Sequence, residues 1–236
     1  MTGKLNGRIA LITGASRGIG RAVARAFAAE GTHLILVART VGGLEEADDE
    51  VRKAGGSATL VPLDLKDFDA LDRLGAQIHE RWGKLDILVG NAGILGSLTP
   101  LTHIEPSEWT KLLDVNVTAN WRLIRSLDPL LRASDAGRAI FVTSSLGRNP
   151  RAYWGGYATS KAALEMLVLT YAAECANSDV RVNLLNPGPT RTRMRAAAYP
   201  GEDPEQNPAP EHLAPLFVEL ASPACTRHGE RLDARR

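Results

Sequence analysis

The sequence has few cysteines, no long apolar run and almost no net charge, and each shortage excludes a class of protein. Its two cysteines, Cys175 and Cys225, form no CxxC motif, which favours reduced packing residues in a cytoplasmic protein. No apolar stretch approaches about 18 residues, so no membrane span is expected. The start of the chain carries no apolar segment of the secretory kind. The net charge of +1 gives no strong field for nucleic acid or an anionic membrane.

Histidines are also few and scattered. The five histidines show no paired ligand spacing, so we expect no metal site. The remaining composition is that of an ordinary globular protein, with 44% hydrophobic and 23% charged residues. The 236 residues suit one α/β domain, or at most two small ones. Because there is no internal repeat and no interdomain linker, we expect a single domain over residues 1–236.

Apolar runs rich in Val, Ile and Leu alternate with helical patterns along the chain. The apolar runs are residues 9–12, 34–37, 59–61, 85–89, 139–142 and 180–185. The helical patterns are residues 18–30, 42–54, 107–131 and 153–176. Continuous apolar runs are typical of strands buried on both faces of a parallel sheet. The alternation predicts an α/β fold, a Rossmann-type doubly wound parallel sheet of about six to seven strands flanked by helices on both faces.

A proline-rich segment lies late in the chain. Residues 199–210 contain four prolines and are predicted to form a loop. A long irregular loop in a compact domain is often a lid over a site. We therefore expect residues 190–210 to be a mobile loop that shapes the substrate pocket. Its arginines either meet an acidic substrate or solvate a mobile helix; they are Arg191, Arg193 and Arg195.

The first predicted strand runs into a glycine-rich turn, TGASRGIG at 13–20. Glycines let the backbone approach a pyrophosphate, and the helix that follows points free N–H groups and its positive dipole end at that anion. The position between a strand and a helix is the context that this motif requires. A purely structural tight turn is the alternative. The expected cofactor contacts are Gly14, Ser16, Arg17, Gly18, Ile19 and Gly20.

The second predicted strand ends in Val-Ala-Arg-Thr, with no acid to bind a ribose 2′-hydroxyl. Arg39 can instead bind a 2′-phosphate bidentately, and Arg17 lies close enough to help. This pattern predicts NADP(H) as the preferred cofactor with NAD(H) as the alternative, unless both are ordinary surface arginines. Asp64, after the third strand, could accept from the adenine amino group, and a helix cap before Asp67 is the competing interpretation.

Tyr157 and Lys161 stand four residues apart, one turn apart on the same face of a predicted helix. Ser144 and Ser145 directly follow a predicted strand, at the sheet edge where ligands bind in this architecture. A Tyr-Lys pair alone is weak evidence, since such neighbours also occur by chance on surfaces. Tyr153 and Trp154, just before Tyr157, either line the substrate pocket or pack.

Together these residues resemble the short-chain dehydrogenase/reductase family in its compact, single-domain form. The matching pieces are TGASRGIG at 13–20, LDL at 63–65, NAG at 91–93, VN at 115–116, SS at 144–145, YATSK at 157–161 and NPG at 186–188. They run in the order seen in the family and cover about residues 5–192. Each piece is common, but the combination is specific.

The resemblance implies catalytic roles for four residues. Tyr157 would be the acid/base, and Lys161 would be its partner and also hold the nicotinamide ribose. Ser144, which lies 13 residues before Tyr157 as in the family, would polarise the substrate oxygen. Asn116 would hold a water in a proton relay. Tyr157 and Lys161 would also contact the cofactor, as would Asp64, Leu65, Asn91, Ala92, Gly93, Pro187, Gly188, Thr190 and Thr192.

The physics of tyrosine favours the Tyr-Lys pairing independently. A free tyrosine has a pKa of about 10, and lowering it by about three units needs roughly 4 kcal/mol of preference for the phenolate. One positive charge about 4 Å away supplies roughly that amount at an effective dielectric of about 20. We therefore expect Lys161, with an oxidised nicotinamide nearby, to lower the pKa of Tyr157, with a serine hydrogen bond helping where oxyanion charge develops.

Two features depart from the family pattern. Gly90 stands where the family often has asparagine, and we expect it only to loosen local packing. The tail lacks the Val-Asp-Gly-Gly signature, and a short last strand near residues 230–232 is the alternative. The resemblance also implies a homodimer or homotetramer, in which helices 107–131 and 153–176 could pair across a twofold axis.

These observations favour an oxidoreductase that transfers a hydride between NADP(H) and a small-molecule carbonyl or secondary alcohol substrate. The cofactor would carry the hydride, and the protein would align it. Two alternatives stay open: a related Tyr-Lys epimerase or dehydratase, and a non-catalytic NAD(P)-binding sensor. A sensor would be expected to lose Ser144, Tyr157 or Lys161, and all three are present. The particular carbonyl compound is not predicted.

Overall fold

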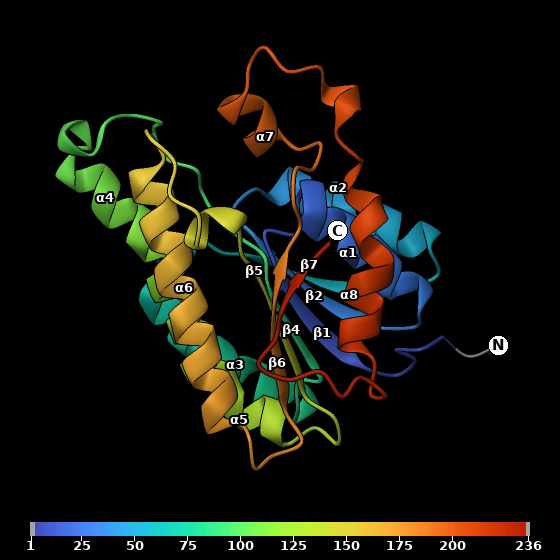
Figure 1. The fold of residues 1–236 in the computed structure, drawn as a ribbon. Helices are drawn as coiled ribbons and strands as arrows, with labels where there is room; N and C mark the ends of the chain where they lie inside the picture. The colour runs from blue at the N-terminus through green and yellow to red at the C-terminus, as the bar shows by residue number, and fades with distance from the viewer. Residues whose placement is uncertain (1–2, 235–236) are drawn as a thin grey trace.

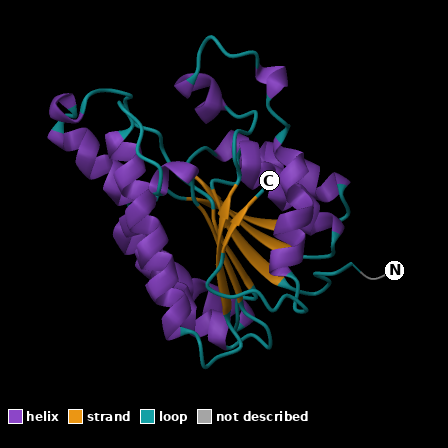
Figure 2. Cartoon of the chain, in the orientation of Figure 1, coloured by secondary structure: helices purple, strands orange, loops and turns teal. Residues whose placement is uncertain are grey.

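A single parallel sheet of seven strands organises the molecule, with helices against both faces (Figures 1 and 2). The computed structural model describes residues 3–234; the expected domain also includes residues 1–2 and 235–236, which lie outside this description. The strands are β1 (Ile9–Thr13), β2 (His33–Ala38), β3 (Ser57–Pro62), β4 (Ile87–Gly90), β5 (Arg138–Val142), β6 (Arg181–Asn186) and β7 (Arg231–Asp233). Their order across the sheet is β3-β2-β1-β4-β5-β6-β7, and every neighbouring pair is parallel. The predicted fold class is confirmed.

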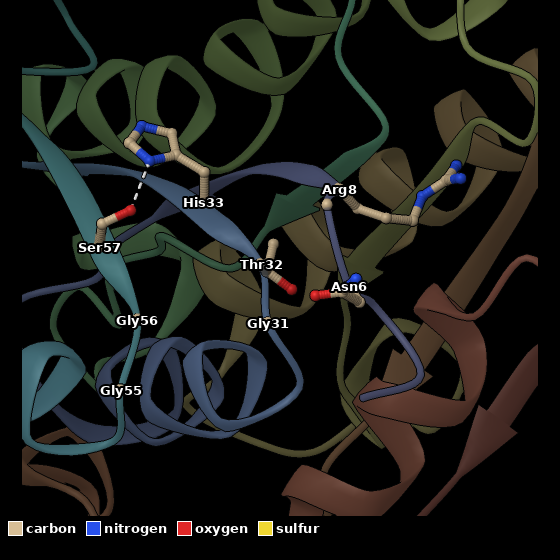
Figure 3. Close-up of a pocket in the computed structure, with 9 residues that line it drawn as sticks. Asn6, Arg8, Gly31, Thr32, His33, Gly55, Gly56 and Ser57 are labelled. Carbon is tan, nitrogen blue, oxygen red and sulfur yellow. Dashed lines mark hydrogen bonds between the residues drawn. The ribbon is translucent and has the colours of Figure 1, made fainter. Parts of the chain in front are cut away.

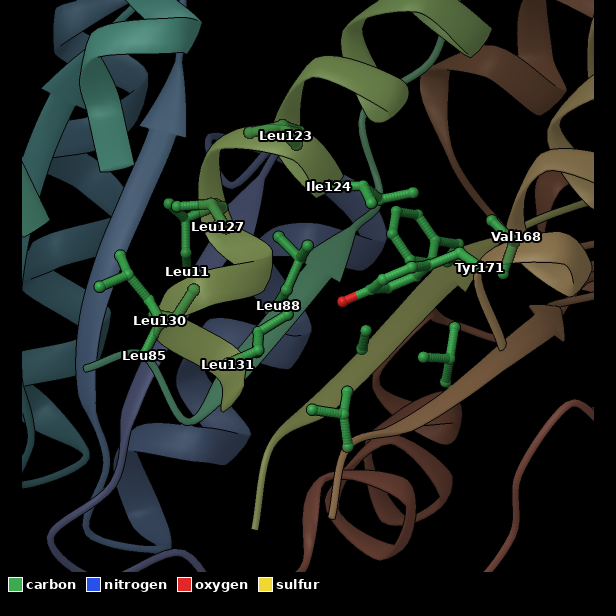
Figure 4. Packing of buried hydrophobic residues seen from close by; sticks show 14 of the residues in the cluster. Leu11, Leu85, Leu88, Leu123, Ile124, Leu127, Leu130, Leu131, Val168 and Tyr171 are labelled. Carbon is green, nitrogen blue, oxygen red and sulfur yellow. The ribbon is translucent and has the colours of Figure 1, made fainter. Parts of the chain in front are cut away.

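Successive side chains of each central strand point to opposite faces, and both faces are covered. In β1, Leu11 faces one hydrophobic core while Ala10 and Ile12 face the other. Figure 4 shows Leu11 and its neighbour Leu88 facing the leucines of a covering helix. Strands buried on both faces need apolar residues at consecutive positions, which is why the runs in the sequence are continuous rather than alternating.

The helices form two layers (Figure 1). One face is covered by α1 (Gly18–Ala29), α2 (Val41–Lys53) and α8 (Ala214–Ala221). The other is covered by α3 (Phe68–Trp82), α5 (Ala119–Arg132) and α6 (Gly155–Glu174). Two shorter helices, α4 (Pro106–Leu113) and α7 (Arg193–Ala198), lie beyond the carboxyl edge of the sheet. None of the helices in residues 3–234 is long and apolar enough to cross a membrane.

The predicted helix over residues 107–131 is two helices joined by a π turn at Asp114–Thr118. A π turn inserts one extra residue into a helix and is frequent at functional sites. The sequence patterns also missed α3 and α8. Asp67 caps α3 by accepting from the Ala70 N–H at 3.0 Å, and Gly83, at φ 72°, ends it.

The amino edge of the sheet holds an amino-edge cluster of Arg8, Lys84, Asp86 and Ser134. Asp86 is fully buried and accepts from the Ile9 N–H (2.9 Å), the Ser134 hydroxyl (2.5 Å) and the Lys84 ammonium (3.0 Å). Arg8 donates to the Ser134 hydroxyl at 3.1 Å and lies 3.4 Å from Asp86. These contacts tie the starts of β1 and β4 to the loop before β5.

A shallow cavity opens at the same amino edge, near the starts of β2 and β3 (Figure 3). Its side-chain lining includes Asn6, Thr32 and His33, and the His33 Nδ1 lies 2.8 Å from the Ser57 hydroxyl. The cavity is therefore at the edge of the sheet opposite to the loops that carry the predicted site residues.

Candidate active site

The predicted site residues come together at the carboxyl edge of the sheet. The strand order reverses between β1 and β4, because one half of the chain builds outward from β1 and the other from β4. Loops that leave neighbouring strands in opposite directions open a crevice at that point, which is where open α/β sheets bind ligands. The loops after β1, β4, β5 and β6 surround this crevice.

The glycine turn after β1 leaves no room for side chains at Gly14 and Gly20. Gly14 has φ +67° and Gly18 has φ +56°, in the left-handed region that favours glycine. A Cβ on Gly14 would lie 2.9 Å from the Asn91 Nδ2, and one on Gly20 would collide with the Gly14 carbonyl. Helix α1 begins directly after Arg17, and no side chain among residues 3–234 caps its first turn. The turn therefore presents free N–H groups to the crevice.

Asn91 and Ala92 hold this turn against the end of β4. The Asn91 Nδ2 donates to the Thr13 carbonyl at 2.9 Å and to the Gly14 carbonyl at 3.4 Å. The main-chain N–H groups of Asn91 and Ala92 both donate to the Thr13 hydroxyl at 3.1 Å. The Asn-Ala-Gly piece thus shapes the crevice from below the glycine turn.

At the other end of the crevice, Arg17 and Arg39 are both exposed. Within the described chain, neither guanidinium pairs with a carboxylate closer than 4.0 Å. Ser16 lies beside the start of α2, since a Cβ on Gly43 would be 2.9 Å from the Ser16 Cβ. Two unpaired cations next to a glycine turn suit a ligand that carries a further phosphate in addition to the one bound at the turn.

Asp64 and Leu65 follow β3 on the same side. Asp64 accepts from the Lys66 N–H at 3.0 Å in a local turn, while Asp67 rather than Asp64 caps α3. The competing interpretation as a helix cap therefore belongs to Asp67, and Asp64 is half-buried with its second oxygen available. Leu65 is buried and packs into the core, so it could offer a ligand only its backbone.

Lys161, Asn116 and Gly93 meet at the centre of the crevice. A Cβ on Gly93 would be 3.2 Å from the Asn116 Oδ1 and 3.6 Å from the Lys161 Nζ, so Gly93 fills the gap between these two polar groups. Lys161 is buried and donates to the Val142 carbonyl at 2.9 Å. Its Nζ lies 5.8 Å from the centre of the Tyr157 ring. Ser144 follows β5, close enough to Tyr157 for its hydroxyl to lower the pKa of that phenol, so all four predicted catalytic residues gather here.

Both polar atoms of the Asn116 side chain, in the π turn, are bonded to protein groups. Its Oδ1 accepts from the Ile94 N–H at 2.8 Å, and its Nδ2 donates to the Ile94 carbonyl at 3.0 Å and to the Ser160 hydroxyl at 2.9 Å. The main-chain carbonyl of Asn116 also accepts from the Asn120 Nδ2 at 3.0 Å.

Burial displaces the pKa values of both central groups. The pKa of Tyr157 is raised to about 12 because burial disfavours the phenolate, although the hydrogen bond with Ser144 acts in the opposite direction. The pKa of Lys161 is lowered to about 8 by burial, and the nearby Glu165 carboxylate opposes that change. The expected lowering of the Tyr157 pKa by Lys161 is therefore wrong for this structure. The ammonium points to the Val142 carbonyl, and desolvation dominates.

The segment after β6 crosses over the glycine turn. Gly188 has φ +66°, and the buried Thr190 hydroxyl donates to the Pro187 and Gly188 carbonyls at 3.4 Å and 3.3 Å. Thr192 caps α7 by accepting from the Arg195 N–H, and its methyl would be 3.5 Å from a Cβ on Gly18. Residues 187–192 thus enclose the crevice from the side opposite Asn91.

An aromatic wall borders Tyr157. Trp154 meets the Tyr157 ring edge-on, with centroids 6.0 Å apart, and lies 5.8 Å from the Tyr199 ring on its other side. Arg151 lies 5.7 Å from the Trp154 ring and donates to the Tyr199 hydroxyl. Trp154 therefore packs against Tyr157, while Tyr153 is 61% exposed with φ 72°, an uncommon backbone for a residue of its size.

Two of the three loop arginines are paired within the loop itself. Arg191 contacts Glu205, and Arg195 bonds Glu202 through its Nε at 2.6 Å. These pairs neutralise most of the positive charge that could meet an acidic substrate. In the part of the chain that the structure describes, no group of three or more His, Cys, Asp or Glu side chains could hold a metal ion.

Gly90 does not loosen its surroundings, contrary to expectation. A Cβ at this position would collide with the Phe141 ring and lie 2.7 Å from the Asn120 Oδ1. Phe141 is fully buried and fills the space that a larger side chain on β4 would occupy. The glycine is therefore matched to a bulky neighbour on β5.

The sequence patterns missed two charged residues beside the site. Glu165 is 4% exposed on α6, one turn after Lys161, and contacts Arg231 of β7. An acid on the apolar face of a helix is a signal that the sequence does contain. Its partner, Arg231, lies in the C-terminal segment that departs from the family pattern, so the pairing could not be predicted.

Comparison with known proteins places these features in a family. The family model described as short chain dehydrogenase matches residues 8–203. The oxidoreductase YciK of Escherichia coli is 39% identical over 92% of this chain and 86% of its own length.

Solved structures agree closely. A short chain dehydrogenase structure from Pseudomonas syringae is 41% identical and superposes with a TM-score of 0.96, over 100% of this chain and 97% of the other. One from Shigella flexneri, in complex with NADP, is 37% identical with a TM-score of 0.95 over 100% of both chains.

Proposed function

The chain belongs to the short-chain dehydrogenase family, and from that premise we propose that it transfers a hydride between NADP(H) and a carbonyl or secondary alcohol substrate. The observation that carries the proposal is the meeting of Ser144, Tyr157 and Lys161 beside a glycine turn in which Gly14 and Gly20 have no room for a side chain. A phenol, an ammonium and a hydroxyl at one point suit proton transfer to or from an alkoxide oxygen.

The groups at the carboxyl edge of the sheet suit the successive parts of a dinucleotide. The uncapped start of α1 suits the pyrophosphate, and the exposed Arg17 and Arg39 suit a 2′-phosphate rather than a ribose hydroxyl. When bound, NADPH would supply the hydride. The NADP-containing relative from Shigella flexneri supports the same cofactor choice. The remaining contacts would come from the loops after β3, β4 and β6 described above.

Tyr157 would act as the acid in the reducing direction. Its buried phenol has a pKa of about 12, so it carries its proton at neutral pH and can donate it to the substrate oxygen. Ser144 would donate a hydrogen bond to the same oxygen, and Lys161 would stabilise the phenolate that remains. Asn116 would hold a relay water through its main-chain carbonyl, since its side-chain amide donates to the Ile94 carbonyl and the Ser160 hydroxyl.

We further propose that the enzyme is a homodimer or a larger assembly that uses the outer faces of α5 and α6. Trp121 on α5 is 43% exposed and Met166 on α6 is 67% exposed, and large apolar groups on one face suit burial against a second copy. The proposal includes a single domain, a cytoplasmic location consistent with the free cysteines, and a 190–210 segment that moves as substrate enters.

The decisive experiment follows NADPH oxidation by the purified protein against a panel of ketones, aldehydes and quinones. We expect turnover with at least one class and loss of turnover in Tyr157→Phe, with NADPH still bound. Tight NADPH binding without turnover of any carbonyl would favour a cofactor sensor, and conversion without net cofactor oxidation would favour an epimerase or dehydratase.

A further inference from the structure

Glu165 is a buried acid beside the site that the proposed mechanism does not use. Its Oε1 accepts from the Thr143 hydroxyl at 2.7 Å, and its Oε2 accepts from the Arg148 Nε at 2.8 Å. The Arg231 Nε lies 3.1 Å from the same Oε1. A carboxylate that is 4% exposed is costly to bury unless charges and donors surround it, and here two guanidiniums and a hydroxyl do so.

These contacts lie on both sides of Ser144. Thr143 precedes it, and Arg148 follows the short turn at Ser145–Gly147. Arg231 reaches the residue itself, because its Nη2 donates to the Ser144 carbonyl at 3.0 Å. The carboxyl-edge cluster of Thr143, Arg148, Glu165 and Arg231 therefore attaches the serine segment to α6.

Helix α6 also carries Tyr157 and Lys161, so the cluster fixes the serine segment relative to the other reacting groups. We propose that Glu165 and Arg231 are positioning residues that keep the Ser144 hydroxyl within reach of the Tyr157 hydroxyl and the substrate oxygen. The proposal rests on the proposed function for the role of Ser144. A displacement of about 1 Å at a reacting group can cost roughly 100-fold in rate, so a main-chain tether is enough to matter.

The charges around Glu165 give the proposal a second observable. Its carboxylate faces Lys161 on its own helix, Arg148 from the serine turn and Arg231 from β7. The carboxylate raises the pKa of Lys161 against the lowering by burial. Removing the charge of Glu165 should shift the alkaline limb of the pH profile of kcat to lower pH. A purely structural defect would leave that limb in place.

The first test compares Arg231→Met with Arg231→Lys and a matched control. Arg138 is 4% exposed, lies at the other end of β5, and also donates to backbone carbonyls, one of them Ser222 at 3.0 Å. We expect Arg231→Met to lower kcat about 10- to 100-fold with NADPH affinity within about twofold. Arg231→Lys should recover part of the loss, and Arg138→Met should reduce stability without reducing kcat.

Hydrogen exchange of residues 144–148 tests the tether without any substrate. We expect faster exchange there in Arg231→Met than in the wild type or Arg138→Met. Glu165→Gln should give the same faster exchange, together with the shifted alkaline limb. If the wild type reduces no carbonyl, the proposed function fails, and the exchange data still decide whether the tether exists. Wild-type exchange and wild-type kcat in Arg231→Met would overturn the inference.

Discussion

Two clusters of buried charge lie at opposite edges of the same sheet, and they differ in what surrounds them. In the amino-edge cluster, Asp86 is satisfied by Ser134, Lys84 and a main-chain N–H, and the nearby cavity is shallow. In the carboxyl-edge cluster, Glu165 is equally well satisfied but lies one turn from Lys161. Both clusters tie loops to strands, so both contribute to the fold.

The difference lies in the neighbouring groups rather than in the buried acids. Beside the carboxyl-edge cluster, Tyr157 and Lys161 have strongly displaced pKa values, and Gly93 leaves room for an approaching ligand. Beside the amino-edge cluster, Arg8 lowers the pKa of the exposed Asp135 and burial lowers that of Arg138, but no Tyr-Lys pair lies there among the described residues. Buried charge alone therefore does not locate a site; buried charge next to displaced titratable groups and open backbone does.

The largest expected effect is a loss of turnover from a substitution at the carboxyl edge of the sheet. Tyr157→Phe keeps the aromatic ring but removes the acid, so carbonyl reduction should fall about 100- to 10,000-fold while NADPH binding persists. Tyr171→Phe, on the same helix but bonded to Asp128 at 2.8 Å, is the matched control and should keep its turnover. Steady-state kinetics and cofactor titration measure both variants, and a fully active Tyr157→Phe would refute the assigned role.

The next effect should appear in stability alone. Asp86→Ala removes the buried partner of Arg8 and Lys84, but Arg8 keeps Asp135 at 2.9 Å and Lys84 is partly exposed, so the free energy of unfolding should drop by about 1–3 kcal/mol. Turnover per folded molecule should stay at the wild-type value. Urea denaturation and kinetics on the folded fraction check this. A loss of turnover in the folded enzyme would mean that the amino edge also supports catalysis and would break the comparison.

A smaller effect concerns the cofactor end of the crevice. Arg39→Ala should weaken NADPH binding about 10- to 100-fold, as expected for loss of hydrogen bonds to a charged group. NADH binding should change little, since NADH has no 2′-phosphate. Arg25→Ala, another surface arginine on the neighbouring helix α1, serves as the control. Equal losses for the two cofactors would contradict the proposed 2′-phosphate contact.

The mildest effect is a pH dependence. Burial lowers the pKa of Lys161 to about 8, so its ammonium is fully present below that pH and is lost as pH rises through it. Reduction should therefore be flat at neutral pH and decline above about pH 8, while Tyr157 keeps its proton throughout. The limb should persist in Asp86→Ala. Its persistence in Lys161→Met would show that another group titrates.

Local patterns predicted most of the fold and the positions of the central residues. The strands are visible as continuous apolar runs because burial on both faces demands them, and the glycine turn is visible because a strand must meet a helix there. Helical spacing placed Tyr157 and Lys161 on one helix face, and the family motifs around them suggested their roles. Each of these features depends on residues that are close together in the sequence.

The missed features depend on residues that are far apart. Gly90 could be understood only beside Phe141, and Glu165 only beside Arg231. The pKa of Tyr157 was mispredicted because spacing reveals a nearby charge but not how completely the phenol is desolvated. The π turn that holds Asn116 likewise reflects packing around one inserted residue rather than a propensity.

The last strand, β7, has a practical consequence for handling this protein. Asn186 donates to Asp233 at 2.6 Å and accepts from the Ala234 N–H at 2.9 Å, so the strand end is tied to the segment that leads into Pro187 and Gly188. A purification tag or fusion partner joined after this strand would disturb residues 187–192, which border the crevice. One joined before β1 attaches at the opposite edge of the sheet and is the better choice for kinetic work.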